Sequence, residues 1–72
     1  MTDRAFDGVP PAPGRFLKIG EVVREVGLSR PQIYRLIRSG DFPRQIRLSP
    51  QRVAWTERDV EHWKLRQLNH QN

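Results

Sequence analysis

Two short apolar patterns of helical spacing, separated by only six residues, constrain the fold of this chain more than any other feature. The first has the spacing i, i+3, i+4, i+7 of one helix face and consists of Ile19, Val22, Val23 and Val26. The second follows the segment Gly27-Leu28-Ser29 and consists of Ile33, Leu36 and Ile37. Two short helices joined by such a tight turn have the layout of a helix-turn-helix.

Residues that favour helix ends stand on both sides of this turn. Gly27 suits the left-handed backbone with which many helices end. Ser29 and Gln32 are three positions apart, as in a capping box. Pro31 falls in the first turn of the second helix, where its missing N–H costs no hydrogen bond, and Gly40 closes that helix. The sequence therefore predicts two separate short helices.

Two stretches after the second helix alternate as half-buried strands do. They are residues 45–48 and 53–55, and the turn-forming segment Ser49-Pro50-Gln51-Arg52 lies between them. A hairpin in this position forms a wing beside the helix-turn-helix. We expect the wing to cover the helices with four inward side chains, which are Ile46, Leu48, Val53 and Trp55.

A last helix is expected to begin after Thr56, which is a good N-cap residue with acidic side chains close behind it. Val60 and Trp63 are its inward pair. Leu65 and Leu68 fall away from that stripe or at its edge, so they are either surface residues or contacts to a neighbouring protomer.

The predicted fold class is mostly α with a small β-hairpin wing, a winged helix-turn-helix. With 72 residues the chain has no room for a second domain. The winged domain is expected over residues 15–68. Residues 1–14 are rich in Pro and Gly and lack apolar periodicity, which is typical of a disordered tail, and residues 69–72 are expected to fray.

Positive charge is concentrated in the middle of the chain. The whole chain has a formal net charge of +5, and residues 28–52 alone hold six arginines against one aspartate, which also gives +5. Such an arginine field is typical of a phosphate-binding surface, because a guanidinium group can bind phosphate or a guanine edge with two hydrogen bonds. Solvated faces usually mix both signs, so nucleic acid is the favoured partner.

The outward face of the second helix suits double-stranded DNA. At 100° per residue Arg35 lies opposite the apolar stripe, with Arg38 beside it, and this helix of a helix-turn-helix enters the major groove. Arg30 lies nearer the stripe and suits a backbone contact, and the Tyr34 ring is expected to pack on the domain. Wing arginines reach a phosphate or a minor groove. The predicted DNA-binding residues are Ser29, Arg30, Pro31, Gln32, Tyr34, Arg35 and Arg38 on the helix, and Arg44, Arg47 and Arg52 on the wing.

No arrangement of side chains in the sequence predicts catalysis, a metal site, a cofactor or a small-molecule substrate. The chain has no cysteine, and His62 and His70 lack partners at ligand spacing. It also has no glycine-rich phosphate loop. No apolar run is long enough to span a membrane, so the expected compartment is the cytoplasm.

Six segments together resemble a known family. They are Ile19-Gly20-Glu21-Val22, Gly27-Leu28-Ser29-Arg30, Ile33-Tyr34-Arg35-Leu36-Ile37, Gly40-Asp41-Phe42-Pro43, Val53-Ala54-Trp55 and Val60-Glu61-His62-Trp63. Over residues 15–66 the chain resembles the AlpA-like proteins, small regulators of phages and mobile elements that are related to excisionases. The resemblance implies a MerR-like winged helix-turn-helix that binds DNA at the bacterial nucleoid. It also implies either activation of recombination genes or excision together with an integrase. Pro31 and Gln32 stand where the family usually has Ser or Thr, so no target sequence is carried over.

Two other classes of function stay open. One is a protein-interaction or antitoxin-like adaptor whose arginines bind an acidic partner, and the other is RNA binding, which usually uses several exposed aromatic rings. For DNA, a single domain of this size covers few base pairs, and the chain has no heptad repeat. We therefore expect several protomers to bind side by side on repeated sites. Leu65 and Leu68 on the last helix are the candidate contacts, against the wing or the first helix of the next protomer, and the sequence identifies no complementary patch.

Overall fold

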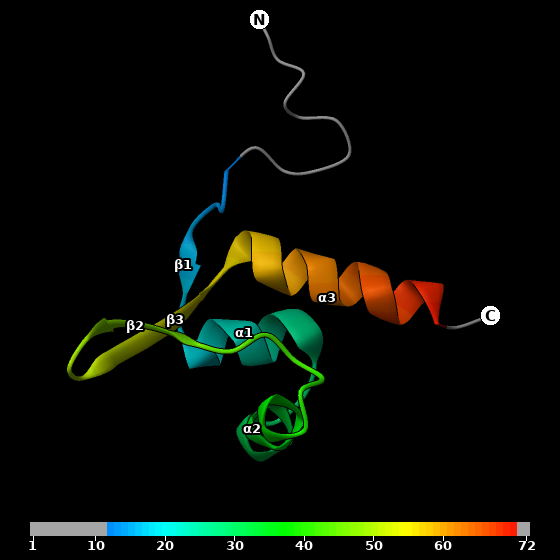
Figure 1. Ribbon diagram of the computed structural model, residues 1–72, viewed down its shortest axis with the longest axis horizontal. Helices are drawn as coiled ribbons and strands as arrows, with labels where there is room; N and C mark the ends of the chain where they lie inside the picture. The colour runs from blue at the N-terminus through cyan, green and yellow to red at the C-terminus, as the bar shows by residue number, and fades with distance from the viewer. Residues whose placement is uncertain (1–11, 71–72) are drawn as a thin grey trace, which may run out of the picture.

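Three helices and three short strands form the part of the chain that the computed structural model describes, residues 12–70. Most of the predicted tail, residues 1–11, lies outside the described residues, as do residues 71–72. The elements follow in the order β1 (Phe16–Leu17), α1 (Ile19–Val26), α2 (Arg30–Arg38), β2 (Ile46–Ser49), β3 (Arg52–Thr56) and α3 (Glu57–Asn69), as Figure 1 shows. The predicted fold class, mostly helical with a hairpin wing, is confirmed.

The helix ends form where the sequence predicts them. Gly27 has a φ of 76° and its N–H donates to the carbonyl of Val23, which ends α1. At the start of α2, the Ser29 N–H donates to Oε1 of Gln32 at 2.8 Å, and the Gln32 N–H donates to Oγ of Ser29 at 3.3 Å. The Thr56 hydroxyl accepts from the N–H of Asp59 and caps α3 in the same way.

The core joins side chains from every helix, from β1 and β3, and from the loop after α2. Its buried members are Leu17, Val22, Ile33, Phe42, Trp55 and Val60. Val22 and Ile33 belong to the two predicted helical stripes, and neither is exposed at all. Trp55 of β3 is also fully buried and belongs to the same cluster, so the helix-turn-helix and the wing share one core.

β1 is an element that the sequence analysis does not predict. Phe16 and Leu17 pair with Thr56 and Trp55, so the antiparallel sheet has the order β1-β3-β2 with β3 in the centre. A strand of two residues has no periodicity to detect, and its partner lies far along the chain.

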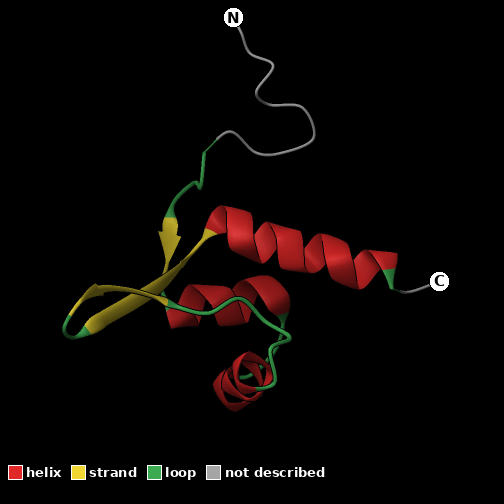
Figure 2. Cartoon of the chain, in the orientation of Figure 1, coloured by secondary structure: helices red, strands yellow, loops and turns green. Residues whose placement is uncertain are grey.

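The prediction that four wing side chains cover the helices is wrong for Ile46 and Leu48, and Val53 covers them only in part. Ile46, Leu48 and Val53 are 38%, 45% and 37% exposed, and only Trp55 is buried. The register pairs Ile46 with Ala54, not with Val53. Because directly opposed residues of a sheet share a face, Ile46 and Val53 point to opposite sides. The hairpin also extends past the helices, as Figure 2 shows, so its far end has nothing to cover.

The residues just before β1 are held against the start of α3. The N–H of Arg58 donates to the carbonyl of Pro13 at 2.9 Å, and the N–H of Glu57 donates to the carbonyl of Arg15 at 3.0 Å. Gly14 has a φ of 80°, and a Cβ atom there would lie 2.5 Å from Oε1 of Glu57. The sequence assigns Pro13 and Gly14 to the tail, and in the structure both lie against the folded domain.

Candidate nucleic-acid interface

α2 has one buried face and one exposed face, as its sequence pattern predicts. Ile33 is fully buried, and Leu36 and Ile37 are half-buried. Arg35 and Arg38 are exposed on the other side. Because all the apolar contacts of α2 lie on the Ile33 side, the arginine side is available to a partner without any loss of core packing.

The first turn of α2 presents Arg30 and Pro31, both exposed, and holds the cap made by Ser29 and Gln32. The side-chain oxygen of Gln32 accepts the N–H of Ser29, so only the NH₂ group of Gln32 keeps its full capacity for a hydrogen bond. The first turn has no acidic residue. The positive end of the helix dipole is therefore left without a compensating carboxylate, which favours an anion nearby.

The Tyr34 ring packs on the domain, as expected. It is half-buried and meets the ring of Trp55 edge to face, with ring centroids 6.3 Å apart. This contact fixes the orientation of the Tyr34 side chain at the border between the core and the exposed face of α2.

The wing places two of its arginines beside α2. A hollow of about 370 Å³ is lined by Ile37 of α2 and by residues of the wing and the segment before it, namely Arg44, Gln45, Arg47 and Val53. Arg47 is paired with Val53, so both side chains lie on the face of the sheet that looks toward α2. The structure thus brings Arg44 and Arg47 together with the C-terminal half of α2.

Arg47 and Arg52 both contact residues at the turn of the wing. Nη1 of Arg47 donates to the carbonyl of Pro50 at 3.3 Å, which ties that guanidinium to the turn. Arg52 is exposed and pairs with Ser49 directly across the turn. Arg52 therefore also lies at the far end of the hairpin.

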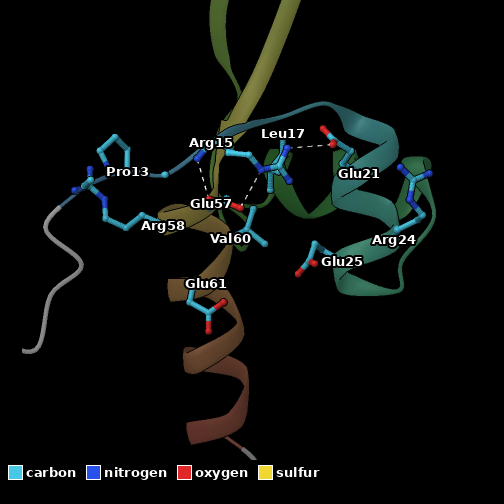
Figure 3. A pocket seen from close by; sticks show the side chains of 12 residues that line it. Pro13, Arg15, Leu17, Glu21, Arg24, Glu25, Glu57, Arg58, Val60 and Glu61 are labelled. Carbon is cyan, nitrogen blue, oxygen red and sulfur yellow. Dashed lines mark hydrogen bonds and ion pairs between the residues drawn. The ribbon is translucent and has the colours of Figure 1, made fainter.

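Ion pairs occur elsewhere in the molecule. Within residues 12–70, cations pair with carboxylates only on α1, on α3 and on the segment before β1. Figure 3 shows Arg15 between Glu57 and Glu21, beside a cavity of about 520 Å³. Lys64 binds Glu25 at 2.7 Å. No arginine of α2 or the wing forms an ion pair with a carboxylate of the described residues.

The pKa values of three of these paired groups reflect their partners. The N–H of Lys18 is the main cause that lowers the pKa of Glu21, and the charge of Arg15 adds to it. The hydrogen bond from Lys64 lowers the pKa of Glu25, and the same bond raises the pKa of Lys64. Charge is therefore satisfied around α1 and α3, while the surface formed by α2 and the wing keeps its positive excess.

Two tryptophan side chains hold the loop between α2 and the wing. Nε1 of Trp55 donates to the carbonyl of Pro43 at 2.9 Å, and Nε1 of Trp63 donates to the carbonyl of Asp41 at 2.7 Å. The sequence pattern predicts Trp63 only as an inward residue of the last helix and does not reveal this role. The available signal is that a buried indole N–H usually needs an acceptor, and main-chain carbonyls of an irregular loop supply one.

Neither a candidate metal site nor a membrane-spanning helix is found within residues 12–70. No group of three His, Cys, Asp or Glu side chains there is arranged to hold a metal ion. None of the helices in this part of the chain has the length and apolar character needed to cross a membrane.

Comparison with known proteins points to prophage regulators. The family described as "Prophage CP4-57 regulatory protein (AlpA)" matches residues 15–68, which run from just before β1 almost to the end of α3. The "Uncharacterized protein ORF88" of Enterobacteria phage P4 is 49% identical over 49 residues. Those residues are 68% of this chain and 56% of that relative, so the match spans little more than half of the relative's length.

Proposed function

The chain belongs to the AlpA family of prophage regulatory proteins, which is a family of regulators and not of enzymes, and on that premise we propose that it binds double-stranded DNA. In this proposal α2 enters the major groove with its arginine side toward the base edges. The wing then lies along the neighbouring backbone or minor groove.

One observation carries the proposal. α2, the wing and the segment between them together present six exposed arginines, none of which pairs with a carboxylate of residues 12–70. The carboxylates that do form ion pairs lie on α1 and α3. A surface that keeps its cations unpaired beside a hollow suits the regularly spaced phosphates of a duplex.

The proposed contacts divide into positioning and base-reading contacts. Arg35, at the centre of the exposed side of α2, is assigned to base edges, with Arg38 beside it. Arg30 and the hydroxyl of Tyr34 suit phosphates, and the wing arginines also position the duplex. The complete proposed interface consists of Ser29, Arg30, Pro31, Gln32, Tyr34, Arg35, Arg38, Arg44, Arg47 and Arg52.

The biological role that follows is control of a phage or integrative element. The protein acts as a transcriptional regulator, as an excisionase that directs an integrase toward excision, or as both, since both roles need the same DNA-binding surface. This role places it at the nucleoid in the bacterial cytoplasm. DNase footprinting on the attachment site of the element, compared with footprinting upstream of its recombination genes, separates the two roles.

Gel-shift competition tests DNA binding itself. A labelled duplex from the attachment region is bound in the presence of unlabelled duplex, RNA of the same sequence or an acidic protein. Duplex DNA should be the best competitor, and the logarithm of affinity should fall linearly with the logarithm of salt concentration. Stronger competition by RNA would favour RNA binding, and stronger competition by the acidic protein would favour an adaptor role.

We also propose that several copies bind side by side on repeated sites. One domain offers a small interface, and adjacent sites raise the effective concentration of neighbouring copies. Sedimentation should then show a monomer at micromolar concentration, and gel shifts on a long natural site should give a ladder of bands. A stable dimer that gives one shifted band on one palindrome would contradict this arrangement.

A further inference from the structure

The face of the sheet that looks away from α2 carries an exposed apolar patch. Phe16 is 53% exposed, Ile46 is 38% exposed and Leu48 is 45% exposed. Phe16 pairs with Thr56 and Ile46 pairs with Ala54, and Thr56 and Ala54 are two positions apart on β3. Phe16 and Ile46 therefore share one face. Leu48 is the extra residue at the register shift between Arg47 and Ser49, where Leu48 and Ser49 together oppose Arg52, which lies on that same face. These three residues are called the outer sheet patch.

A second apolar patch lies on α3. Leu65 is 48% exposed and Leu68 is 68% exposed. They are three positions apart, so they lie on one side of the helix, and Glu61 lies on the same side one turn before Leu65. The carboxylate side chain of Glu61 is 57% exposed. Leu65 and Leu68 are called the α3 leucine pair.

The two patches lie at different ends of the molecule. In Figure 1 the wing extends to one side and α3 runs to the other, with α2 below and between them. One copy therefore cannot cover its outer sheet patch with its own α3 leucine pair. Contact between the two patches therefore needs a second copy.

We propose that the outer sheet patch of one copy docks on the α3 leucine pair of a second copy. The inference rests on the proposed binding of several copies along DNA and names the surfaces that meet. Because the contact joins two different surfaces, it repeats from copy to copy and does not close as a two-fold dimer.

Charge complementarity supports a second copy as the occupant. Arg52 lies two positions before Ala54 on β3, which places it on the outer face beside the patch. Glu61 flanks the α3 leucine pair, and its exposed carboxylate lies 3.9 Å from Lys64 on the same helix. The carbonyls at the C-terminal end of α3 add negative partial charge near Leu68. Each patch has only two or three side chains, which is too little for a stable dimer in free solution. The contact is therefore expected to form when DNA holds two copies close together.

Cysteine cross-linking tests the contact directly, since the natural chain has no cysteine. Leu48→Cys and Leu68→Cys proteins are mixed on a duplex with two adjacent sites and treated with a short thiol-specific cross-linker. The expected result is a mixed dimer, with little product from either protein alone. Cross-linking of Leu48→Cys to itself, as efficient as in the mixture, would overturn the proposed pairing.

Binding cooperativity gives a second readout. The double variant Ile46→Ser/Leu48→Ser and the double variant Leu65→Ser/Leu68→Ser should each lower the cooperativity between two adjacent sites by about tenfold. Affinity for a single site should stay within about twofold of the natural protein. Val53→Ser, matched in exposure to Ile46 but on the opposite face, and Gln67→Ser on α3 are the controls, and cooperativity should persist in both.

Failure of this inference differs from failure of DNA binding. Unchanged cooperativity in both double variants, with normal single-site affinity, would overturn the docking contact and leave DNA binding intact. If no duplex binds at all, the cross-linking mixture is repeated at high protein concentration without DNA. A mixed dimer there would still support the contact, and its absence would overturn it.

Discussion

The indole N–H of Trp63 donates a hydrogen bond of 2.7 Å to the main-chain carbonyl of Asp41, which fastens α3 to the loop between α2 and the wing. Phe42 of the same loop packs against the Trp63 ring, with centroids 4.9 Å apart. A residue of the last helix thus helps to set the position of the wing relative to α2, although it lies on neither of them.

Trp63→Phe should lower the free energy of unfolding by about 1–3 kcal/mol, because the hydrogen bond to a main-chain carbonyl is lost and the smaller ring gives up part of the packing against Phe42. Urea denaturation measures the change. Leu65→Ala on the exposed side of the same helix is the control and should have little effect on stability. A Trp63→Phe protein as stable as the natural one would show that the bond to Asp41 contributes nothing.

Arg35→Ala should weaken binding to a specific site by about 1–3 kcal/mol and relax base preference at one position. This is the loss expected when a guanidinium group no longer donates two hydrogen bonds to one base edge. Unfolding free energy should be nearly unchanged, since Arg35 is exposed. Fluorescence anisotropy with specific and random duplexes measures both affinities. Arg24→Ala, an exposed arginine on α1, is the matched control. Equal losses on the two duplexes would remove Arg35 from base reading.

On short duplexes that accommodate a single copy, Arg52→Ala should weaken binding to specific and random sequences alike, because the far end of the wing is expected to contact phosphate. The slope of log affinity against log salt should become shallower by about one unit for one lost phosphate contact. Arg52 is preferred to Arg47 for this test, since Arg47 also bonds to the turn at Pro50. A changed base preference with an unaltered salt slope would indicate that the wing reads bases.

Gly14→Ala should lower the free energy of unfolding by about 1–3 kcal/mol, because the backbone is left-handed there and the new Cβ would collide with the Glu57 carboxylate. Gly20→Ala is the opposite control. It lies within α1 with nothing near its Cβ position, so stability should rise by about 0.5–1 kcal/mol. Thermal unfolding of both variants checks the pair, and a harmless Gly14→Ala would show that the segment before β1 is not tied to α3.

Stability should fall in acid because of the paired carboxylates of α1. Lys64 lowers the pKa of Glu25 from its usual 4.5, so the pair stabilises the fold above that pH and the contribution is lost as pH falls through the lowered pKa. Because the pKa of Lys64 is raised, the stabilisation by this pair is lost on the alkaline side only as pH rises above 10.5. Glu25→Gln should therefore show a smaller fall in melting temperature between about pH 6 and pH 3. Parallel curves for the two proteins would exclude the pair as a cause.

The helices and their caps are predictable from the sequence because their signals are local. Ser29, Gln32 and Gly27 act within one turn of their own position, and the apolar stripes repeat along a single helix. The outward direction of Arg35 follows from the same periodicity. Neither the hydrogen bond that occupies the side-chain oxygen of Gln32 nor the hollow beside Arg44 and Arg47 follows from periodicity alone.

The sheet is less predictable because its faces depend on pairing between distant residues. β2 has a register shift between Arg47 and Ser49, and the pairing sets Ile46 against Ala54 and so reverses the face expected for Ile46 relative to Val53. The junction of Arg15 with Glu57 is likewise a meeting of residues far apart in the chain. No local sequence pattern predicts such a contact.

The central place of β3 in the sheet affects how the chain acquires its shape during synthesis. α1 and α2 leave the ribosome before Trp55, which completes their core, and before the partner of Leu17 exists. Short helices are marginal in water without packing. The two helices are therefore expected to stay largely unfolded until β3 emerges, so a truncated translation product that stops within the wing has no DNA-binding shape to compete with the finished protein.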